Sequence, residues 1–234
     1  MIPGLGCVEY APGLAGAGVS VLLIFDLDGT LVDSIHDLAE SASDLSERHG
    51  GARLNDETVT LMIGEGAPVL VERVMALAGH AAPPAGALEE FLEIYDGRMC
   101  DTTRPYPGML DTLRALADEH AMALLTNKPE DSGRKILAHA GLAGFFAHMV
   151  FGDGPLGRKP NPAGLHWLLE RHGASAERSI LIGDSDVDIA TAQAAGVRIC
   201  LARYGFGFVR INPASLRGDE WFLDQPRDLI ALLA

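Results

Sequence analysis

Short apolar runs recur along the chain, each about as long as a β-strand in a protein interior. Five of them have this character: Val21–Phe25, Ala121–Leu125, His148–Phe151, Ser179–Ile182 and Arg198–Ala202. Continuous rather than alternating apolar residues are typical of parallel strands that are buried on both faces. Helical patterns separate the later runs, at Met109–His120, Asp131–Ala140, Pro162–His172 and Asp188–Ala195. The alternation predicts an α/β fold, with a Rossmann-like parallel sheet and helices on both of its faces.

The segment between the first two predicted strands has a different pattern. It contains no clear strand and four helical stretches: Asp37–His49, Asp56–Met62, Ala67–Ala78 and Ala87–Met99. A helical insertion of this length predicts a small separate domain, or cap, over residues 35–103. Pro105 and the Pro107-Gly108 pair mark the return of the chain to the core. The α/β core then comprises residues 21–34 and 104–234.

The first twenty residues are rich in glycine and alanine. They lack the basic start and the continuous apolar stretch of a signal peptide. We interpret residues 1–20 as a loosely held N-terminal extension.

The charge of the chain excludes some classes of partner. A net charge of −14, from 18 basic and 32 acidic residues, disfavours nucleic-acid binding, which needs a basic face. It allows a small anionic substrate, because charges farther away than the Debye length of about 8 Å are screened. No run approaches the ~18 apolar residues of a membrane span. Cys7, Cys100 and Cys200 lack metal-binding spacing and are interpreted as idle thiols in a reducing cytosol. We expect a cytoplasmic monomer or homodimer with no nucleic-acid or membrane partner.

Two carboxylates follow the first predicted strand, where open α/β sheets bind ligands. Asp26 and Asp28 are two residues apart, so their side chains share a direction in extended backbone. Adjacent carboxylates repel each other unless a cation intervenes, and Mg²⁺ prefers oxygen ligands. The pair therefore indicates a Mg²⁺ site. An ordinary acidic turn after a strand is the alternative.

Polar residues also follow the later strands. Thr126 and Asn127 end the second strand and can donate hydrogen bonds to a phosphoryl oxygen, although Thr126 alone could be a turn residue. Lys159 lies in a proline-bounded loop before a helix, where a lone lysine is usually solvated. Asp184, Asp186 and Asp188 place three acids within five residues, a density that a divalent cation explains better than packing does.

The ordered segments DLDGTLVDS, LLTNK, RKPNP and GDSDVD resemble the four motifs of the haloacid dehalogenase superfamily. The resemblance extends over nearly the whole chain from Val21 and includes a helical cap after the first motif. The segments DSIHDLAESASDLSERHG, IGEGAPVLVERVM, RPYPGMLDTL and ARYGFG are most similar to bacterial phosphoglycolate phosphatases. The N-terminal extension departs from that pattern.

The resemblance implies a role for each candidate residue. Asp26 would be the nucleophile that forms an aspartyl-phosphate, and Asp28 the general acid and then the general base. Thr126 and Asn127 would hold the phosphoryl oxygens, and Lys159 would neutralise charge on Asp26 and on the phosphate. Mg²⁺ would be bound by Asp184, by an Asp26 carboxylate oxygen and by the Asp28 backbone carbonyl, with Asp188 in or beside the metal site. The resemblance assigns no role to Asp186.

The implied function is Mg²⁺-dependent hydrolysis of a small phosphorylated metabolite, with 2-phosphoglycolate as the leading substrate. Other small phosphate esters, pyrophosphate, a sugar phosphomutase, a haloacid dehalogenase and a non-catalytic binding protein are the alternatives. Asp28 argues against a dehalogenase, which needs no acid for the leaving group. The absence of lysine from residues 35–103 removes a Schiff-base phosphonate hydrolase. Arg73 and the Gly64–Gly66 loop are candidates for contacting a carboxylated substrate, with a solvated helix arginine as the alternative for Arg73.

Overall fold

The computed structural model describes residues 20–234 of the chain. The expected N-terminal extension, including Cys7, therefore lies outside the described residues except for Ser20. No helix of the described part is both long and apolar enough to cross a lipid bilayer.

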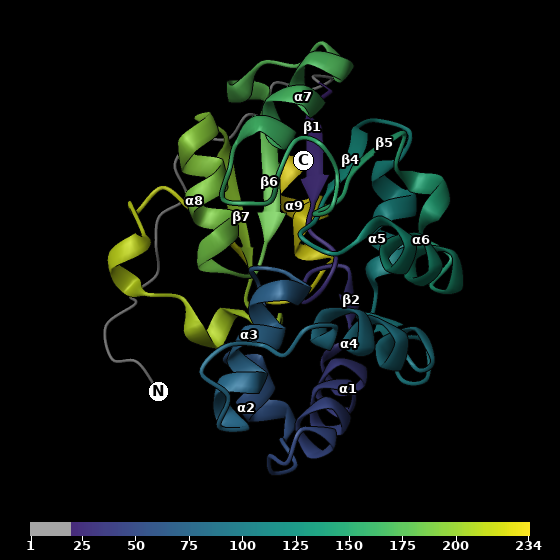
Figure 1. Ribbon diagram of the computed structural model, residues 1–234. Coiled ribbons are helices and arrows are strands. Elements are labelled where there is room, and N and C mark those ends of the chain that lie inside the picture. The colour runs from purple at the N-terminus through teal and green to yellow at the C-terminus, as the bar shows by residue number, and fades with distance from the viewer. Residues whose placement is uncertain (1–19) are drawn as a thin grey trace.

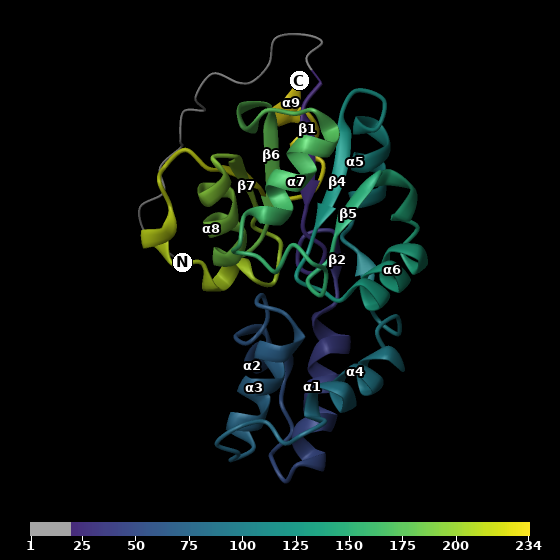
Figure 2. The same ribbon diagram turned by 45° about the horizontal axis from the view of Figure 1, so that its top comes forward.

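A six-stranded parallel sheet forms the centre of the larger domain (Figures 1 and 2). Its order is β5-β4-β1-β6-β7-β8, and β1 pairs with β4 on one side and β6 on the other. The strands are β1 (Leu22–Phe25), β4 (Ala121–Leu125), β5 (His148–Val150), β6 (Ser179–Gly183), β7 (Arg198–Ala202) and β8 (Trp221–Leu223). The predicted α/β fold is confirmed, but β8 was not expected, because its apolar run has only three residues.

Helices cover both faces of this sheet, as predicted. Alternate residues of β1 belong to different cores: Leu22 and Ile24 pack with α7 and α8, whereas Leu23 and Phe25 pack with α5, α6 and α9. The helices are α5 (Met109–Leu116), α6 (Glu130–His139), α7 (Ala163–His172), α8 (Asp186–Ala195) and α9 (Asp228–Leu233). Short 3-10 turns lie in the loops, at η1 (Ala143–Phe145), η2 (Ala176–Arg178), η3 (Phe208–Arg210) and η4 (Pro213–Ser215).

A second, purely helical group lies beyond the carboxyl ends of the strands (Figure 2). It consists of α1 (Ile35–Arg48), α2 (Asp56–Thr60), α3 (Ala67–Leu77) and α4 (Ala87–Asp96). Its longest helix, α1, packs against the other three through Leu38, Ala39, Ala42 and Leu45, which recur at helical spacing. These helices all fall within the segment that we expect to form the cap.

Two segments of the chain connect the cap to the core. They pair as a short antiparallel ribbon of β2 (Val32–Asp33) and β3 (Arg104–Pro105). Asp37 links the two connecting segments, because its carboxylate accepts hydrogen bonds from the backbone N–H and the hydroxyl of both Thr102 and Thr103. The side chain of Asp37 is buried, so buried hydrogen bonds hold the two segments together at this junction.

Candidate active site

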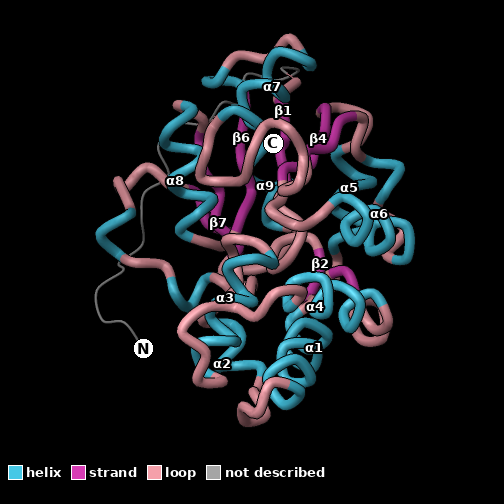
Figure 3. Tube along the Cα trace, viewed as in Figure 1, coloured by secondary structure: helices cyan, strands magenta, loops and turns pink. Residues whose placement is uncertain are grey.

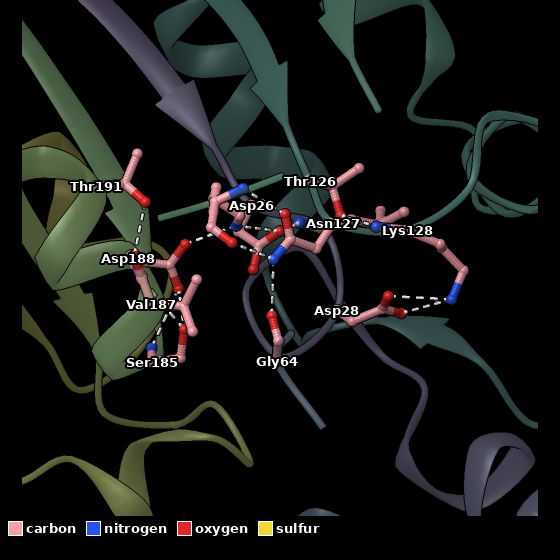
Figure 4. A network of polar contacts seen from close by, with 12 residues as sticks. Asp26, Asp28, Gly64, Thr126, Asn127, Lys128, Ser185, Val187, Asp188 and Thr191 are labelled. Atoms are coloured by element: carbon pink, nitrogen blue, oxygen red, sulfur yellow. Dashed lines mark hydrogen bonds and ion pairs between the residues drawn. The ribbon is translucent and has the colours of Figure 1, made fainter. Parts of the chain in front are cut away.

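Loops follow the strands at one edge of the sheet (Figure 3), and Asp26, Thr126 and Asp188 lie close together there (Figure 4). Asp26 directly follows β1, Thr126 follows β4, and Asp184 follows β6. Lys159 lies in the loop between β5 and α7. Because the carboxyl ends of parallel strands meet at the same edge, residues far apart in the sequence become neighbours here.

Three buried carboxylates form the centre of this cluster. Asp26, Asp184 and Asp188 each offer an oxygen, and these oxygens lie within 4.8 Å of one another. Burial raises the pKa of Asp26 to about 6, Lys159 opposes the rise and Asp188 adds to it. Burial, followed by the charges of Asp188 and Asp26, holds the pKa of Asp184 well above its usual range. Several hard oxygen ligands that repel one another in a buried site fit a cation such as Mg²⁺.

Glycines form a close-fitting cradle around Asp184. A Cβ on Gly29 would lie 1.9 Å from Asp184 Oδ2, and Gly29 also has a positive φ of 82°. A Cβ on Gly205 would lie 2.5 Å from the Asp184 Cβ. The Gly207 N–H donates a hydrogen bond of 2.8 Å to Asp184 Oδ2. The position of this carboxylate therefore depends on backbone that no larger residue could supply.

Lys159 contributes a positive charge to the cluster. Its Nζ lies 2.9 Å from Asp26 Oδ1 and 2.6 Å from Asp188 Oδ1. Burial alone would lower the pKa of Lys159, but attraction to Asp188 and Asp26 outweighs burial and raises it. The ammonium therefore stays charged beside Asp26.

Asn127 holds the backbone of Lys159 at both ends. Its Oδ1 accepts the Lys159 N–H at 2.7 Å, and its Nδ2 donates to the Lys159 carbonyl at 2.9 Å. Nδ2 also donates to the Gly64 carbonyl of the cap at 3.0 Å. Both donors of the side-chain amide are thus engaged by carbonyls, so the Asn127 side chain positions Lys159 and the cap loop. Thr126 differs, because its hydroxyl accepts the Lys128 N–H and keeps its own proton to donate.

Asp188 is held from several sides. Its Oδ2 accepts the Ser185 hydroxyl at 2.5 Å and the N–H groups of Asp184 and Ser185 at 3.3 and 3.2 Å. Ser185 and Asp188 form a capping box at the start of α8. Asp188 thus fixes both Lys159 and the turn that carries Asp184. Asp186, which the sequence left without a role, accepts the Asn212 N–H and holds a neighbouring loop.

The side chain of Asp28 points away from the three clustered carboxylates (Figure 4). Its oxygens lie 3.1 and 3.0 Å from Lys128 Nζ, and Oδ1 also accepts the Ser34 hydroxyl at 2.6 Å. Lys128 in turn donates to the Tyr95 hydroxyl of α4 at 2.8 Å. Sequence reasoning missed the roles of Lys128 and Tyr95. The sequence did offer a clue for Lys128, because it lies beside Thr126 and Asn127 in the same motif. It offered none for Tyr95.

A cavity between core and cap opens onto these groups. Asp26, Asp28 and Thr126 line it from the core, and apolar side chains line it from the cap, namely Leu38, Ile63, Leu70, Phe91 and Leu92. Gly64 and Gly66 also line it, as expected. Arg73 is not among the lining residues and instead donates to the Met62 carbonyl and pairs with Glu65. The structure thus does not place Arg73 where it could contact a substrate in this cavity.

Comparison with known proteins agrees with this geometry. Residues 23–202 match the family model of the haloacid dehalogenase-like hydrolases. A phosphoglycolate phosphatase of Pseudomonas fluorescens is 38% identical over 217 residues, covering 89% of this chain and 78% of the relative. One from Photobacterium profundum is 35% identical over 215 residues, covering 89% of this chain and 93% of the relative.

A solved structure shows the same arrangement of both domains. It is described as a predicted phosphoglycolate phosphatase from Haemophilus somnus 129pt, and it matches this chain with a TM-score of 0.84 at 30% identity. The match covers 93% of this chain and 99% of the other. The resemblance inferred from the four motifs is therefore confirmed, and the chain belongs to the haloacid dehalogenase-like hydrolase family.

Proposed function

We propose that the protein is a Mg²⁺-dependent phosphatase that transfers the phosphoryl group of a small ester to Asp26 and then to water. The observation that carries the proposal is the joint position of Asp26 and Asp28 on the wall of one cavity, with Lys159 bound to Asp26 behind it. A nucleophile, a group able to exchange protons, and positive charge are the parts that such a transfer requires.

The carboxylates of Asp26 and Asp184 and the backbone carbonyl of Asp28 would hold the Mg²⁺, with Asp188 beside them. When bound, the ion would offset the repulsion between the anionic nucleophile and the anionic phosphate. The buried acidic cluster supports this assignment, because oxygen ligands suit Mg²⁺.

The protein's own groups account for the remaining chemistry. Lys159 and the Leu27 N–H both contact Asp26 Oδ1, which fixes the carboxylate for attack on phosphorus. As the new bond to phosphorus forms, the bond to the alcohol oxygen breaks, and Asp28 gives that oxygen a proton. Asp28 then takes a proton from water, whose oxygen attacks the phosphorus and releases phosphate and free Asp26.

We propose 2-phosphoglycolate as the substrate. Two observations support it: the similar relatives bear the name phosphoglycolate phosphatase, and side chains of the cap form one wall of the cavity, which limits the size of the leaving group. A cytoplasmic location and a monomeric or homodimeric state remain predictions of the sequence.

A phosphate-release assay over a panel of substrates tests the proposal. The panel contains 2-phosphoglycolate, other small phosphate esters, pyrophosphate and a sugar phosphate, each with Mg²⁺ and with EDTA. We expect Mg²⁺-dependent turnover with 2-phosphoglycolate preferred, and no turnover by Asp26→Asn, which keeps its size but loses its nucleophile. Turnover that survives thorough chelation would contradict the metal assignment, and an active Asp26→Asn variant would contradict the nucleophile.

A further inference from the structure

Arg210 is a cavity residue that none of the four sequence motifs contains. It ends the 3-10 turn η3 (Phe208–Arg210), in the core segment between β7 and β8. Its guanidinium reaches across to the cap, where Nη1 donates to the Leu61 carbonyl at 3.3 Å and Nη2 donates to the Ile63 carbonyl. Arg210 therefore lines the cavity from the core while it holds the cap loop that closes it.

Carboxylates of the described residues act on Arg210 only from beyond ion-pairing distance, namely Asp184, Asp186 and Glu65. Lys128, another cation on the cavity wall, is paired with Asp28, and its remaining contact is the Tyr95 hydroxyl. Among the ion pairs of residues 20–234, none includes Arg210. Its Nε is buried and has no hydrogen-bond acceptor. A buried donor without an acceptor is costly, and a guanidinium binds carboxylates in preference to neutral groups.

We propose that Arg210 determines specificity by binding, through its guanidinium, a carboxylate on the leaving portion of the substrate. The inference rests on the proposed phosphatase function and goes further, because it names the residue that recognises the part of the substrate remote from the phosphate. Since the same guanidinium holds the carbonyls of Leu61 and Ile63, a bound carboxylate also strengthens the closed position of the cap.

A pair of substrates separates recognition of the carboxylate from simple closure of the cap. In 2-hydroxyethyl phosphate, a hydroxymethyl group replaces the carboxylate of 2-phosphoglycolate, and the rest of the ester is unchanged. Arg73 supplies the matched comparison. It also donates to a carbonyl of the cap loop, that of Met62 at 2.8 Å, but it does not line the cavity. Arg73→Met therefore measures the effect of loosening the loop without loss of a carboxylate contact.

The experiment measures kcat/KM of wild type, Arg210→Met, Arg210→Lys and Arg73→Met with both esters. We expect Arg210→Met to reduce kcat/KM for 2-phosphoglycolate by roughly 10- to 150-fold more than for 2-hydroxyethyl phosphate, as for a lost charged hydrogen bond. Arg210→Lys should recover part of this preference, because it restores the charge without the planar fork of the guanidinium. Arg73→Met should slow both esters by the same factor.

The outcomes distinguish the two proposals. Wild type that hydrolyses neither these two esters nor any other member of the substrate panel contradicts the phosphatase function itself. Wild type that hydrolyses only other members of the panel overturns the carboxylate assignment alone. Wild type that is active, with an Arg210→Met variant that slows both esters equally or not at all, overturns the carboxylate assignment alone. Wild type that prefers the neutral ester overturns it as well. Hydrolysis of 2-hydroxyethyl phosphate by the variants shows that they are folded, and if Arg210→Met does not fold, Arg210→Lys decides the question by the same comparison.

Discussion

Replacing Lys159 with methionine would remove the one cation of residues 20–234 that pairs with the clustered carboxylates Asp26 and Asp188. Lys159 Nζ pairs with both Asp26 and Asp188, and the side chains of Lys159 and Asp188 are 2% and 0% exposed. Methionine keeps much of the volume of the lysine stem and contributes no charge. The variant therefore leaves three acidic groups, including Asp184, without a compensating charge in the absence of metal.

The cost can be estimated from the burial of these groups. Removing one partner of a buried ion pair destabilises a protein by about 3–5 kcal/mol. For a protein of this size, each kcal/mol corresponds to roughly 2–4 °C in Tm. We therefore expect the Tm of Lys159→Met in EDTA to lie about 6–20 °C below that of wild type. Lys135→Met is the control. Lys135 also pairs with an aspartate, Asp96, but both side chains are about half exposed, at 54% and 53%, so its Tm should stay close to that of wild type.

Metal binding provides the second part of this prediction. Without the lysine, the carboxylates no longer share their charge with an ammonium, so added Mg²⁺ should bind more tightly and raise the Tm of Lys159→Met more than that of wild type. Thermal unfolding over a Mg²⁺ titration measures both effects. A variant that unfolds within about 2 °C of wild type in EDTA, and that gains no more from Mg²⁺, would refute the view that Lys159 balances this cluster.

Three further predictions follow from the contacts of other residues. Asp28→Asn should slow hydrolysis of 2-phosphoglycolate by about 10²–10⁴-fold. With 4-nitrophenyl phosphate the variant should still give a burst of nitrophenolate in rapid mixing, because that leaving group needs no proton. Absence of the burst would argue for a structural role of Asp28. Although burial raises it, hydrogen bonds from two threonines lower the pKa of Asp37 below 3.8. Asp37→Asn should therefore reduce the free energy of unfolding by about 2–4 kcal/mol at pH 7. The difference, measured in urea, should shrink as the pH falls below 3.8, because the unfolded chain then takes up a proton that the folded carboxylate, with its lower pKa, still resists; a pH-independent difference would contradict the role of this charge at the junction. Gly205→Ala should raise the Mg²⁺ concentration for half-maximal activity, because its Cβ would lie 2.5 Å from the Cβ of Asp184. Gly144→Ala is the control and should leave this concentration unchanged, because open space surrounds Gly144. Equal Mg²⁺ requirements of the two variants would contradict the view that glycines position Asp184.

The sequence was sufficient to predict the strands that carry the site and most of its charged residues. Each strand of the large sheet except β8 overlaps one of the five predicted apolar runs, and Asp26, Lys159 and Asp184 lie in short motifs after such runs. Local patterns of this kind reflect local physics, since a buried strand needs apolar residues on both faces and the loop that follows it meets solvent. The cap helices could also be predicted from the sequence, because the spacing of apolar residues along an amphipathic helix is a local property.

Contacts between distant segments could not be predicted in this way. The partner of Lys128 on the cap, Tyr95, is 33 residues away, and the carbonyl that Arg210 binds belongs to Ile63, 147 residues away. Arg73 had the right charge and a plausible place on the cap, yet its guanidinium turns to Met62 and Glu65. The packing of the two domains decides which arginine lines the cavity. A pattern within one segment of the sequence cannot predict this packing.

The most direct measurement of the central claim is the mass of the peptide that contains Asp26, after the enzyme is mixed with Mg²⁺ and substrate and quenched in acid. The Asp28→Asn variant with 4-nitrophenyl phosphate is the best sample, because loss of the base slows the attack of water on the phosphoenzyme. The mechanism proposed from the geometry of Asp26 and Lys159 predicts one added phosphoryl group on Asp26, released by hydroxylamine and absent from Asp26→Asn. Rapid turnover with no phosphoryl group on this peptide, or with the group on another residue, would contradict the mechanism.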